Sequence, residues 1–356
     1  MIKRLFRGAV LLLALCFLFG SMAPSGFAAS WDVEIDHDCS LKISSGSLEQ
    51  REDLALANIV YDLYLIADAI DDPIMYGYGY DLHTPYASLT ITDTMQDEDW
   101  TLLAQKAAQL ALAQDTPALT AAPVDQTLTR LDDGSKLGCG LYLILARGAD
   151  LTDYVLDEET APGVHEIKTI ARSPEYEYRF APQLISLPGR DPGVTGTGTP
   201  GTWYYDMHIE LKPEREVRLG SIEIIKTLLS YRASESASFV FSVDAVRENQ
   251  LVFSDVVALG FDDAGSSRVR IDNLPAGSEV TVREIYSGAC YAPDSSDVAS
   301  KIVVADSVEP LSFVNDYDEE AKGGHGIVNN FRYSATGDWI WTQGTDSAAI
   351  SQGGNP

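Results

Sequence analysis

Cysteine is scarce in this chain of 356 residues, and so are basic side chains. The chain has four cysteines, and 25 lysines and arginines stand against 53 aspartates and glutamates, which gives a formal net charge of −28. A shortage of positive charge argues against binding to nucleic acid phosphates, and an acidic surface disfavours anionic membranes. So few cysteines also argue against a small scaffold that depends on several disulfides.

Sequence motifs of enzymes and metal sites are missing as well. The chain has no His-Glu-x-x-His motif and no Gly-x-Ser-x-Gly motif. The glycine-rich segment 196–202 is not followed by Gly-Lys-Thr/Ser, so it does not predict a phosphate loop. The adjacent residues Asp36–Cys39 point to alternate faces if they are extended, which disfavours a metal site. We therefore expect no enzyme with turnover, no cofactor and no metal.

The N-terminus has the pattern of a secretory signal peptide. Three basic residues within the first seven positions precede the apolar run Ala9–Phe19. Gly26 and Ala28 then occupy the −3 and −1 positions of a cleavage site, and the apolar run is too short to span a membrane comfortably. We expect residues 1–28 to be removed and the mature protein to be secreted, either extracellular or associated with the cell surface.

Three cysteines remain after this processing, namely Cys39, Cys139 and Cys290. Cys39 and Cys139 are the candidate pair for a single disulfide. The alternative is that all three are small side chains in buried or half-buried positions.

The segment 29–216 mixes strand patterns with one helix. Its strand-like runs lie at 58–67, 141–146, 176–187 and 202–211. Residues 97–113 lack glycine and proline, open with acidic residues, and carry apolar side chains at helical spacing, which predicts a helix. We interpret this segment as a β-sandwich domain with a helical insertion.

The pattern changes near residue 217. Short alternating runs follow at 221–228, 237–246, 251–260, 267–271, 279–286, 301–305 and 311–317, with turn signals between them. Many short strands with regular turns are typical of a β-sandwich. The sequence thus predicts a second β domain at 217–334 and a polar, partly disordered C-terminal extension at 335–356.

Two segments near the C-terminus echo each other, Phe313–Tyr317 (FVNDY) and Ile327–Phe331 (IVNNF). Each has an asparagine at its centre, although asparagine is depleted from strands. Asn315 and Asn329 could each be a turn residue, a buried hydrogen-bonding group or a reactive carboxamide.

A lysine and a glutamate on predicted strands give the third interpretation a mechanism. Lys226 lies on the first strand of the second domain, Glu284 on a later strand and Asn315 on the last clear one. Burial lowers the pKa of an amine and raises that of a carboxyl group. The protonated carboxyl group can then donate a hydrogen bond to the carbonyl oxygen of the carboxamide and polarise it for attack by the amine. The alternative is a surface ion pair between Lys226 and Glu284, which contributes little to stability.

The segments that carry these residues resemble a known family. Residues 220–228 (GSIEIIKTL), 273–291 (NLPAGSEVTVREIYSGACY) and 312–331 resemble B-type domains of the collagen adhesins of Gram-positive bacteria. The resemblance covers about residues 220–333 and implies an Ig-like or prealbumin-like β-sandwich with a Lys–Asn isopeptide bond. It matches Lys226 with the lysine, Glu284 with the promoting acid and Asn315 with the asparagine, while Asn329 is the fallback.

The first domain resembles, less specifically, the N-terminal domain of sortase-assembled pilins. The residues concerned are 140–144 (GLYLI), 176–189 (YEYRFAPQLISLPG) and 203–214 (WYYDMHIELKPE). The resemblance implies Lys212 as a lysine that links subunits, although Lys-Pro here departs from the family's Tyr-Pro-Lys order. A C-terminal sorting motif is missing, so we do not expect this chain to donate a linkage. The alternatives are a secreted relative, an accessory subunit that only accepts a linkage, and a protein whose anchoring is supplied elsewhere.

Taken together, these patterns predict a mainly β protein with tandem Ig-like or prealbumin-like sandwiches. By resemblance, it is a secreted or cell-surface structural protein of the pilin or adhesin type. Its expected partners are other pilin subunits joined by a sortase, or a host or matrix ligand. The alternative is a secreted adhesion module that binds a glycan or a host-matrix protein without pilus assembly.

Overall fold

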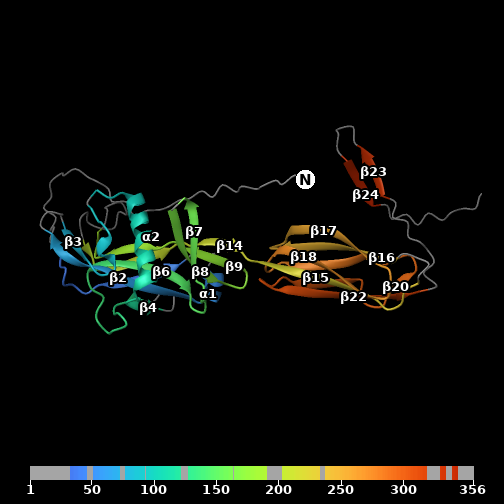
Figure 1. Ribbon diagram of the computed structural model, residues 1–356, viewed down its shortest axis with the longest axis horizontal. Helices are drawn as coiled ribbons and strands as arrows, with labels where there is room; N and C mark the ends of the chain where they lie inside the picture. Colours follow the sequence, from blue (N-terminus) through green and yellow to red (C-terminus); the bar gives the residue numbers. More distant parts are fainter. Residues whose placement is uncertain are drawn as a thin grey trace, which may run out of the picture. The chain divides into compact units, whose positions relative to one another are not determined.

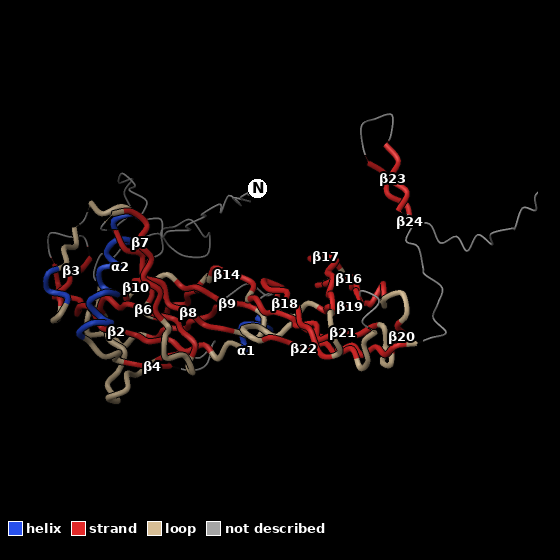
Figure 2. Tube along the Cα trace, turned by 45° about the vertical axis from the view of Figure 1, so that its right-hand side comes forward, coloured by secondary structure: helices blue, strands red, loops and turns tan. Residues whose placement is uncertain are grey.

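The computed structural model describes residues 33–45, 51–72, 77–92, 94–121, 127–162, 164–190, 203–232, 237–318, 329–333 and 339–343. The chain divides into two compact units, Met1–Arg218 and Leu219–Pro356 (Figure 1). Strands make up most of both units, and the helices α1 and α2 lie in the first (Figure 2). The mainly β fold class with a helical insertion is therefore confirmed. The predicted signal peptide, 1–28, lies outside the described residues.

The described residues of the first unit form three principal sheets. One has the order β10-β6-β2-β3, with β4 also paired to β2, and the others have the orders β14-β9-β8-β7 and β13-β1-β5. Their strands are β1 (Ser40–Ser45), β2 (Ile59–Asp72), β3 (Gly77–Leu82), β4 (Leu119–Ala121), β5 (Thr127–Leu128), β6 (Gly140–Gly148), β7 (Val155–Ala161), β8 (Val164–Arg172), β9 (Tyr176–Phe180), β10 (Gln183–Leu187), β13 (Asp206–Leu211) and β14 (Glu214–Val217). Strands β11 (Gly189–Arg190) and β12 (Trp203–Tyr204) form a short antiparallel pair.

Strand β6 shows why the first unit needs a helix. Nearly all its side chains are buried, because one face packs into the main core of the unit and the other faces helix α2 (Asp97–Gln114). A strand covered on both faces reads as a continuous apolar run, as LYLILA does. Helix α2 contributes the buried alanines Ala107, Ala108 and Ala111, and its first turn carries a capping box between Gln96 and Asp99. Two shorter helices, α1 (Arg51–Leu56) and the 3-10 turn η1 (Tyr86–Ser88), lie in connections.

Two of the predicted strands are wrong in extent. The run 176–187 is divided between β9 and β10, which belong to different sheets, and the break falls at Ala181–Pro182. Proline has no N–H to donate to a ladder, so the chain leaves one sheet there and enters another. The run 202–211 is likewise divided, into β12 and β13.

The second unit contains two four-stranded sheets with the orders β18-β15-β22-β20 and β17-β16-β19-β21. Inward side chains of both sheets form one core. The strands are β15 (Leu219–Leu228), β16 (Ala237–Arg247), β17 (Gln250–Phe261), β18 (Gly265–Pro275), β19 (Glu279–Tyr286), β20 (Tyr291–Pro293), β21 (Val298–Ile302) and β22 (Val308–Tyr317). The predicted strand at 301–305 is wrong in its bounds, since β21 spans Val298–Ile302. The sequence pattern did not indicate β20.

Strands β15 and β22 are the feature that positions the candidate site. They are the first and last strands of the two four-stranded sheets, yet they lie side by side and run parallel. Gly220 allows the start of β15 to lie close to the backbone of Val304. A Cβ atom at this position would be 2.2 Å from the carbonyl oxygen of Val304.

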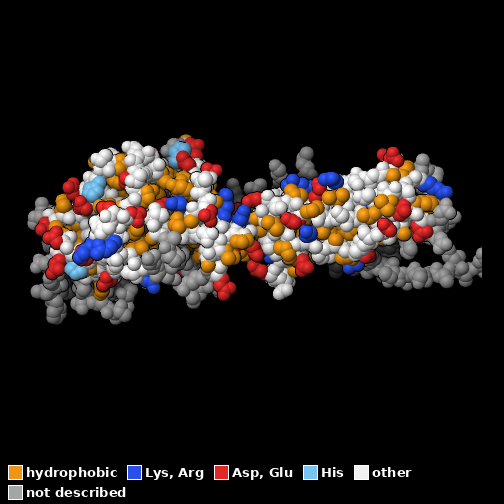
Figure 3. All heavy atoms as spheres, turned by 90° about the horizontal axis from the view of Figure 1, so that it is seen from below, with side chains coloured by type: hydrophobic (Ala, Val, Ile, Leu, Met, Phe, Trp, Pro, Cys, Tyr) orange, Lys and Arg blue, Asp and Glu red, His pale blue; other side chains and the backbone are white. Residues whose placement is uncertain are grey.

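The C-terminal segment contains a separate antiparallel pair, β23 (Asn329–Tyr333) and β24 (Trp339–Gln343). Asn329 therefore begins a strand that pairs with β24, and its side chain lies outside what the structure describes. Within the described residues, no helix is both long and apolar enough to cross a membrane. On the face that Figure 3 shows, acidic side chains are scattered over both units, in keeping with the net charge of −28.

Candidate crosslinking site

The structure brings Lys226, Glu284 and Asn315 together inside the second unit. Lys226 on β15 and Asn315 on β22 come from one sheet, and Glu284 on β19 comes from the sheet that faces it. In the parallel register Leu228 lies opposite Asn315, so Lys226 is two positions away and shares the same inner face. The alternation of buried and half-buried residues along these strands directs all three side chains into the core.

The carboxylate of Glu284 connects the two other groups. Lys226 Nζ donates to Glu284 Oε1 at 3.0 Å and to Oε2 at 2.9 Å, and Asn315 Nδ2 donates to Oε1 at 2.6 Å. The side chains of Lys226 and Glu284 are 0% and 1% exposed, and Asn315 is 0% exposed. The alternative of a surface ion pair is therefore wrong.

Two phenylalanines of β16 complete the surroundings of the amine. Lys226 Nζ lies 4.5 Å from the ring centre of Phe239 and 5.7 Å from that of Phe241. The ring faces attract a cation, but they stabilise its charge less than water does. Burial lowers the pKa of Lys226, although the hydrogen bond and the charge of Glu284 act in the opposite direction. A lowered pKa raises the fraction of neutral amine, which is the nucleophilic form.

The carboxamide is oriented differently from the sequence-based expectation. We expected Glu284 to contact the carbonyl oxygen of Asn315, whereas it contacts the nitrogen. Asn315 Oδ1 is buried and has no hydrogen-bond partner among the described residues. An unpaired buried oxygen costs about 1–3 kcal/mol, so this core holds a polar group that its non-covalent contacts leave unsatisfied.

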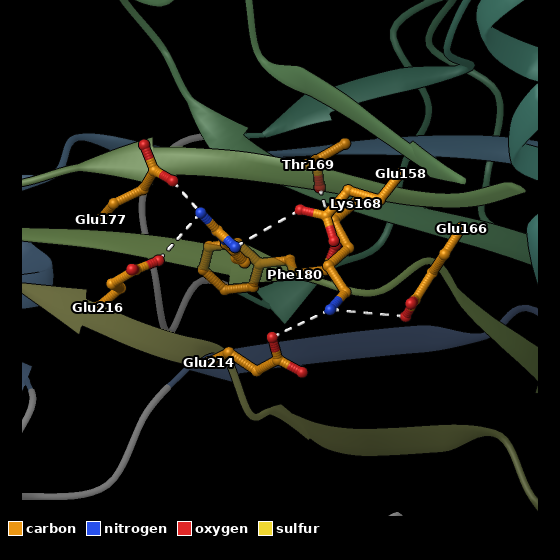
Figure 4. A network of polar contacts seen from close by, with 9 residues as sticks. Glu158, Glu166, Lys168, Thr169, Glu177, Phe180, Glu214 and Glu216 are labelled. Carbon is orange, nitrogen blue, oxygen red and sulfur yellow. Dashed lines mark hydrogen bonds and ion pairs between the residues drawn. The ribbon is translucent and has the colours of Figure 1, made fainter. Parts of the chain in front are cut away.

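Lys168 on β8 shows how a lysine behaves in a purely acidic setting. Its Nζ lies 3.0 Å from Glu214 Oε2 and 3.6 Å from Glu166 Oε1, and Figure 4 shows both carboxylates pointing at it. Partial burial lowers its pKa, but the hydrogen bond to Glu214 and the surrounding acidic charges outweigh that effect and raise it. Lys168 therefore stays protonated, and no asparagine is among its contacts in the described part of the chain. Of these two lysines, Lys226 is the one that combines full burial with a nearby carboxamide.

The remaining predicted residues lie elsewhere. Lys212 is exposed in the two-residue connection between β13 and β14. Cys39 and Cys139 are buried thiols with their sulfur atoms 3.6 Å apart, and Cys290 is half-buried. Within the described ranges, no group of three or more His, Cys, Asp or Glu residues is arranged to hold a metal ion.

No protein-family model and no curated protein matches this chain. Among solved structures, the minor pilin GBS52 of Streptococcus agalactiae is 13% identical over 78% of this chain and 96% of its own, with a TM-score of 0.22. The major pilin of Streptococcus pyogenes is 11% identical over 79% of this chain and 97% of its own, with a TM-score of 0.21.

A third similar structure is an adhesin of Mobiluncus mulieris, described as containing intramolecular disulfide, isopeptide and ester bond crosslinks. It is 13% identical over 73% of this chain and 83% of its own, with a TM-score of 0.24. The similar structures are thus pilins and adhesins, but all three TM-scores lie well below 0.5, so these similarities carry no argument about this chain.

Proposed function

We propose that the second unit crosslinks itself through an isopeptide bond between Lys226 and Asn315, promoted by Glu284. The observation that carries this proposal is the contact of all three groups in a buried core, with Glu284 Oε1 within 3.0 Å of the amine and 2.6 Å of the carboxamide nitrogen. The fold holds the reactants together, so the reaction needs no bimolecular encounter.

The reaction begins with a proton transfer from the Lys226 ammonium group to Glu284, which leaves a neutral amine beside a neutral acid. The amine nitrogen then attacks Cγ of Asn315, the Nζ–Cγ bond forms and the Cγ–Nδ2 bond breaks. Glu284 accepts the proton that the amine loses and delivers one to the departing nitrogen, which leaves as ammonia. The contact of one carboxylate oxygen with both nitrogens supports this relay.

The carbonyl oxygen must also be stabilised while it carries negative charge. During the attack, a half-turn of the Asn315 carboxamide exchanges the places of Oδ1 and Nδ2, so that the protonated carboxyl group of Glu284 donates to the oxygen. This arrangement removes the unpaired buried oxygen described above. The reverse turn brings Nδ2 back to Glu284 before the Cγ–Nδ2 bond breaks, so the departing nitrogen receives its proton there. The reaction happens once per molecule, so Glu284 promotes a maturation step and the chain is not an enzyme with turnover.

The position of the bond suits a structural protein of a cell surface. It would join β15 to β22, which lie side by side and run parallel. In sequence, these are the first and the last strand of the two four-stranded sheets. Force applied at the ends of this unit then reaches the covalent bond before it can separate the two strands. We infer a secreted or cell-surface structural protein of the pilin or adhesin type, in which this unit is a Cna B-type domain.

An intact mass of the full chain tests the crosslink. We expect a deficit equal to one ammonia in the wild-type protein and none in the variants Lys226→Met and Asn315→Ala. Lys301→Met is the matched control, because Lys301 is a partly exposed lysine of the same unit beside Glu309, and it should keep the deficit. A wild-type protein with the full sequence mass contradicts the proposal.

Pilus assembly is tested separately, at Lys212. The exposed position of this side chain supports its access to a sortase-bound partner. We expect covalent multimers with a sortase and a donor subunit, and their loss in Lys212→Arg. Monomers in both proteins, together with binding of a glycan or a matrix protein, would instead favour the adhesion module.

A further inference from the structure

The cysteine pair of the first unit has a defined place between two sheets. Cys39 directly precedes β1, Cys139 directly precedes β6, and these strands belong to different sheets. Backbone hydrogen bonds fix both residues: Cys39 N donates to Leu137 O at 2.7 Å, and Ala69 N donates to Cys139 O at 3.2 Å. The two cysteines are 4% and 7% exposed, and their Sγ atoms lie 3.6 Å apart.

The surroundings of these sulfurs do not suit a metal or a catalytic thiol. Besides each other, the sulfurs contact the backbone oxygens of Glu34 and His37 at 3.4–3.8 Å. Burial raises the pKa of both thiols, and for Cys39 the neighbouring Cys139 raises it further. A reactive cysteine needs the opposite shift, toward the thiolate.

We propose that Cys39 and Cys139 form a disulfide that fastens the β1 sheet to the β6 sheet in the exported protein. The oxidant is a disulfide-carrying thiol oxidoreductase or small-molecule disulfide of an oxidising compartment. Each cysteine loses one proton, the pair loses two electrons as the S–S bond forms, and the oxidant's disulfide is reduced to two thiols. A disulfide needs a sulfur separation of about 2.05 Å, so the two sulfur atoms approach each other by about 1.5 Å.

Burial determines when this bond forms. Thiol–disulfide exchange needs a thiolate and access to the oxidant, and the folded core supplies neither. The bond therefore forms while the first unit is still folding. Once formed, it is shielded from reductants by the same burial, so a reducing agent opens it readily only when a denaturant is present.

The consequence for function is mechanical. The disulfide closes a loop from Cys39 to Cys139 that contains β1 to β5 and the helices α1, η1 and α2. A chain pulled from its two ends bypasses this loop, because tension passes through the S–S bond. About one hundred residues, or about 360 Å of extended chain, are then removed from the length that unfolding can release. This inference does not depend on the isopeptide bond, since the two crosslinks lie in different units.

The test uses the full chain, refolded with oxidised and reduced glutathione and then treated with an alkylating agent under denaturing conditions. We expect a mass deficit of two hydrogens, and a non-reduced peptide map that joins the peptides containing Cys39 and Cys139. The matched control Cys290→Ser should keep both results, whereas Cys139→Ser should lose them. Alkylation of Cys39 and Cys139 without prior reduction, or a bond to Cys290, overturns the proposal.

Single-molecule force spectroscopy gives a readout that does not depend on variant stability. The contour length released by the first unit should be shorter by about 360 Å in the oxidised wild-type chain than in the same chain after reduction in denaturant and refolding under reducing conditions. Equal lengths before and after reduction contradict the disulfide. The ammonia deficit of the second unit is unaffected in either case, so failure of one crosslink is distinguishable from failure of the other.

Discussion

Replacement of both Lys226 and Glu284 separates the covalent bond from the ion pair that precedes it. Removal of Lys226 alone leaves a buried carboxylate without its cation, which destabilises by about 3–5 kcal/mol whether or not a bond exists. The double variant Lys226→Met/Glu284→Gln removes both charges, keeps similar side-chain volumes, and retains an amide oxygen that can accept from Asn315 Nδ2. It cannot form the isopeptide bond.

The expected effect follows from the loop that the bond closes. Lys226 and Asn315 enclose about ninety residues, and the loop-closure relation used for disulfides gives a stabilisation of about 4–5 kcal/mol. For a unit of about one hundred residues, that free energy corresponds to a fall in melting temperature of about 20 °C or more. Without a bond, replacing a buried ion pair by neutral groups of similar volume is often neutral or stabilising. The presence and the absence of the bond therefore predict changes in melting temperature that differ in sign or greatly in magnitude.

Differential scanning calorimetry of the full chain measures the effect. We expect one unfolding transition to fall by about 20 °C in the double variant while the other stays in place. The matched control is Lys301→Met/Glu309→Gln, which removes a partly exposed pair 3.8 Å apart and should cost less than about 1 kcal/mol. A double variant that melts within a few degrees of the wild-type protein, or above it, refutes the reasoning.

Three further predictions concern other parts of the structure. Asp62 is 1% exposed, and its carboxylate pairs with Arg147 at 2.5 Å. Asp62→Ala leaves that arginine without its partner, so the free energy of unfolding of the first unit, measured in urea, should fall by about 3–5 kcal/mol. Gly220→Ala should destabilise the second unit by about 1–3 kcal/mol through its backbone clash, whereas Gly260→Ala, with open space at its Cβ, should not; equal effects contradict this. In the variant Asn315→Ala, Lys226 has no carboxamide to react with, so its amine remains able to titrate. Because burial lowers the pKa of Lys226 in the folded state, the unfolded state binds its proton more tightly, and stability should rise with pH toward the ordinary lysine pKa of about 10.4. The same pH profile after Lys226→Met is added contradicts that assignment.

Local patterns in the sequence were sufficient for the fold class and the single long helix. The alternation in 279–286 marks β19 from end to end, and the alanine-rich run marks α2. Patterns of this kind do not specify long-range pairing. The parallel pairing of β1 with β13 joins residues that lie more than 160 positions apart, and nothing in either strand indicates the other. The strand β2 was underestimated because its last residues, 68–72 (DAIDD), are rich in aspartate, which is depleted from strands.

The candidate site was predicted as residues and not as a geometry. A lysine inside an apolar run indicated Lys226. The strand positions of Glu284 and Asn315 made them candidates, and the family resemblance matched them with the acid and the asparagine. Burial of all three depends on the facing of two sheets, which no single strand pattern specifies. The contact of Glu284 with the carboxamide nitrogen and the unpaired Asn315 Oδ1 depend on side-chain positions within the core, so they required the structure.

Peptide mapping of trypsin-digested wild-type protein tests the central claim most directly. Trypsin does not cleave at a lysine whose amine is bonded, so we expect one branched peptide that joins residues 219–232, uncut at Lys226, to residues 302–322, which contain Asn315. Fragmentation should place the bond between these two residues and show the loss of one ammonia. Three linear peptides, 219–226, 227–232 and 302–322, would contradict the account, and so would a branch to residues 323–332, which contain Asn329.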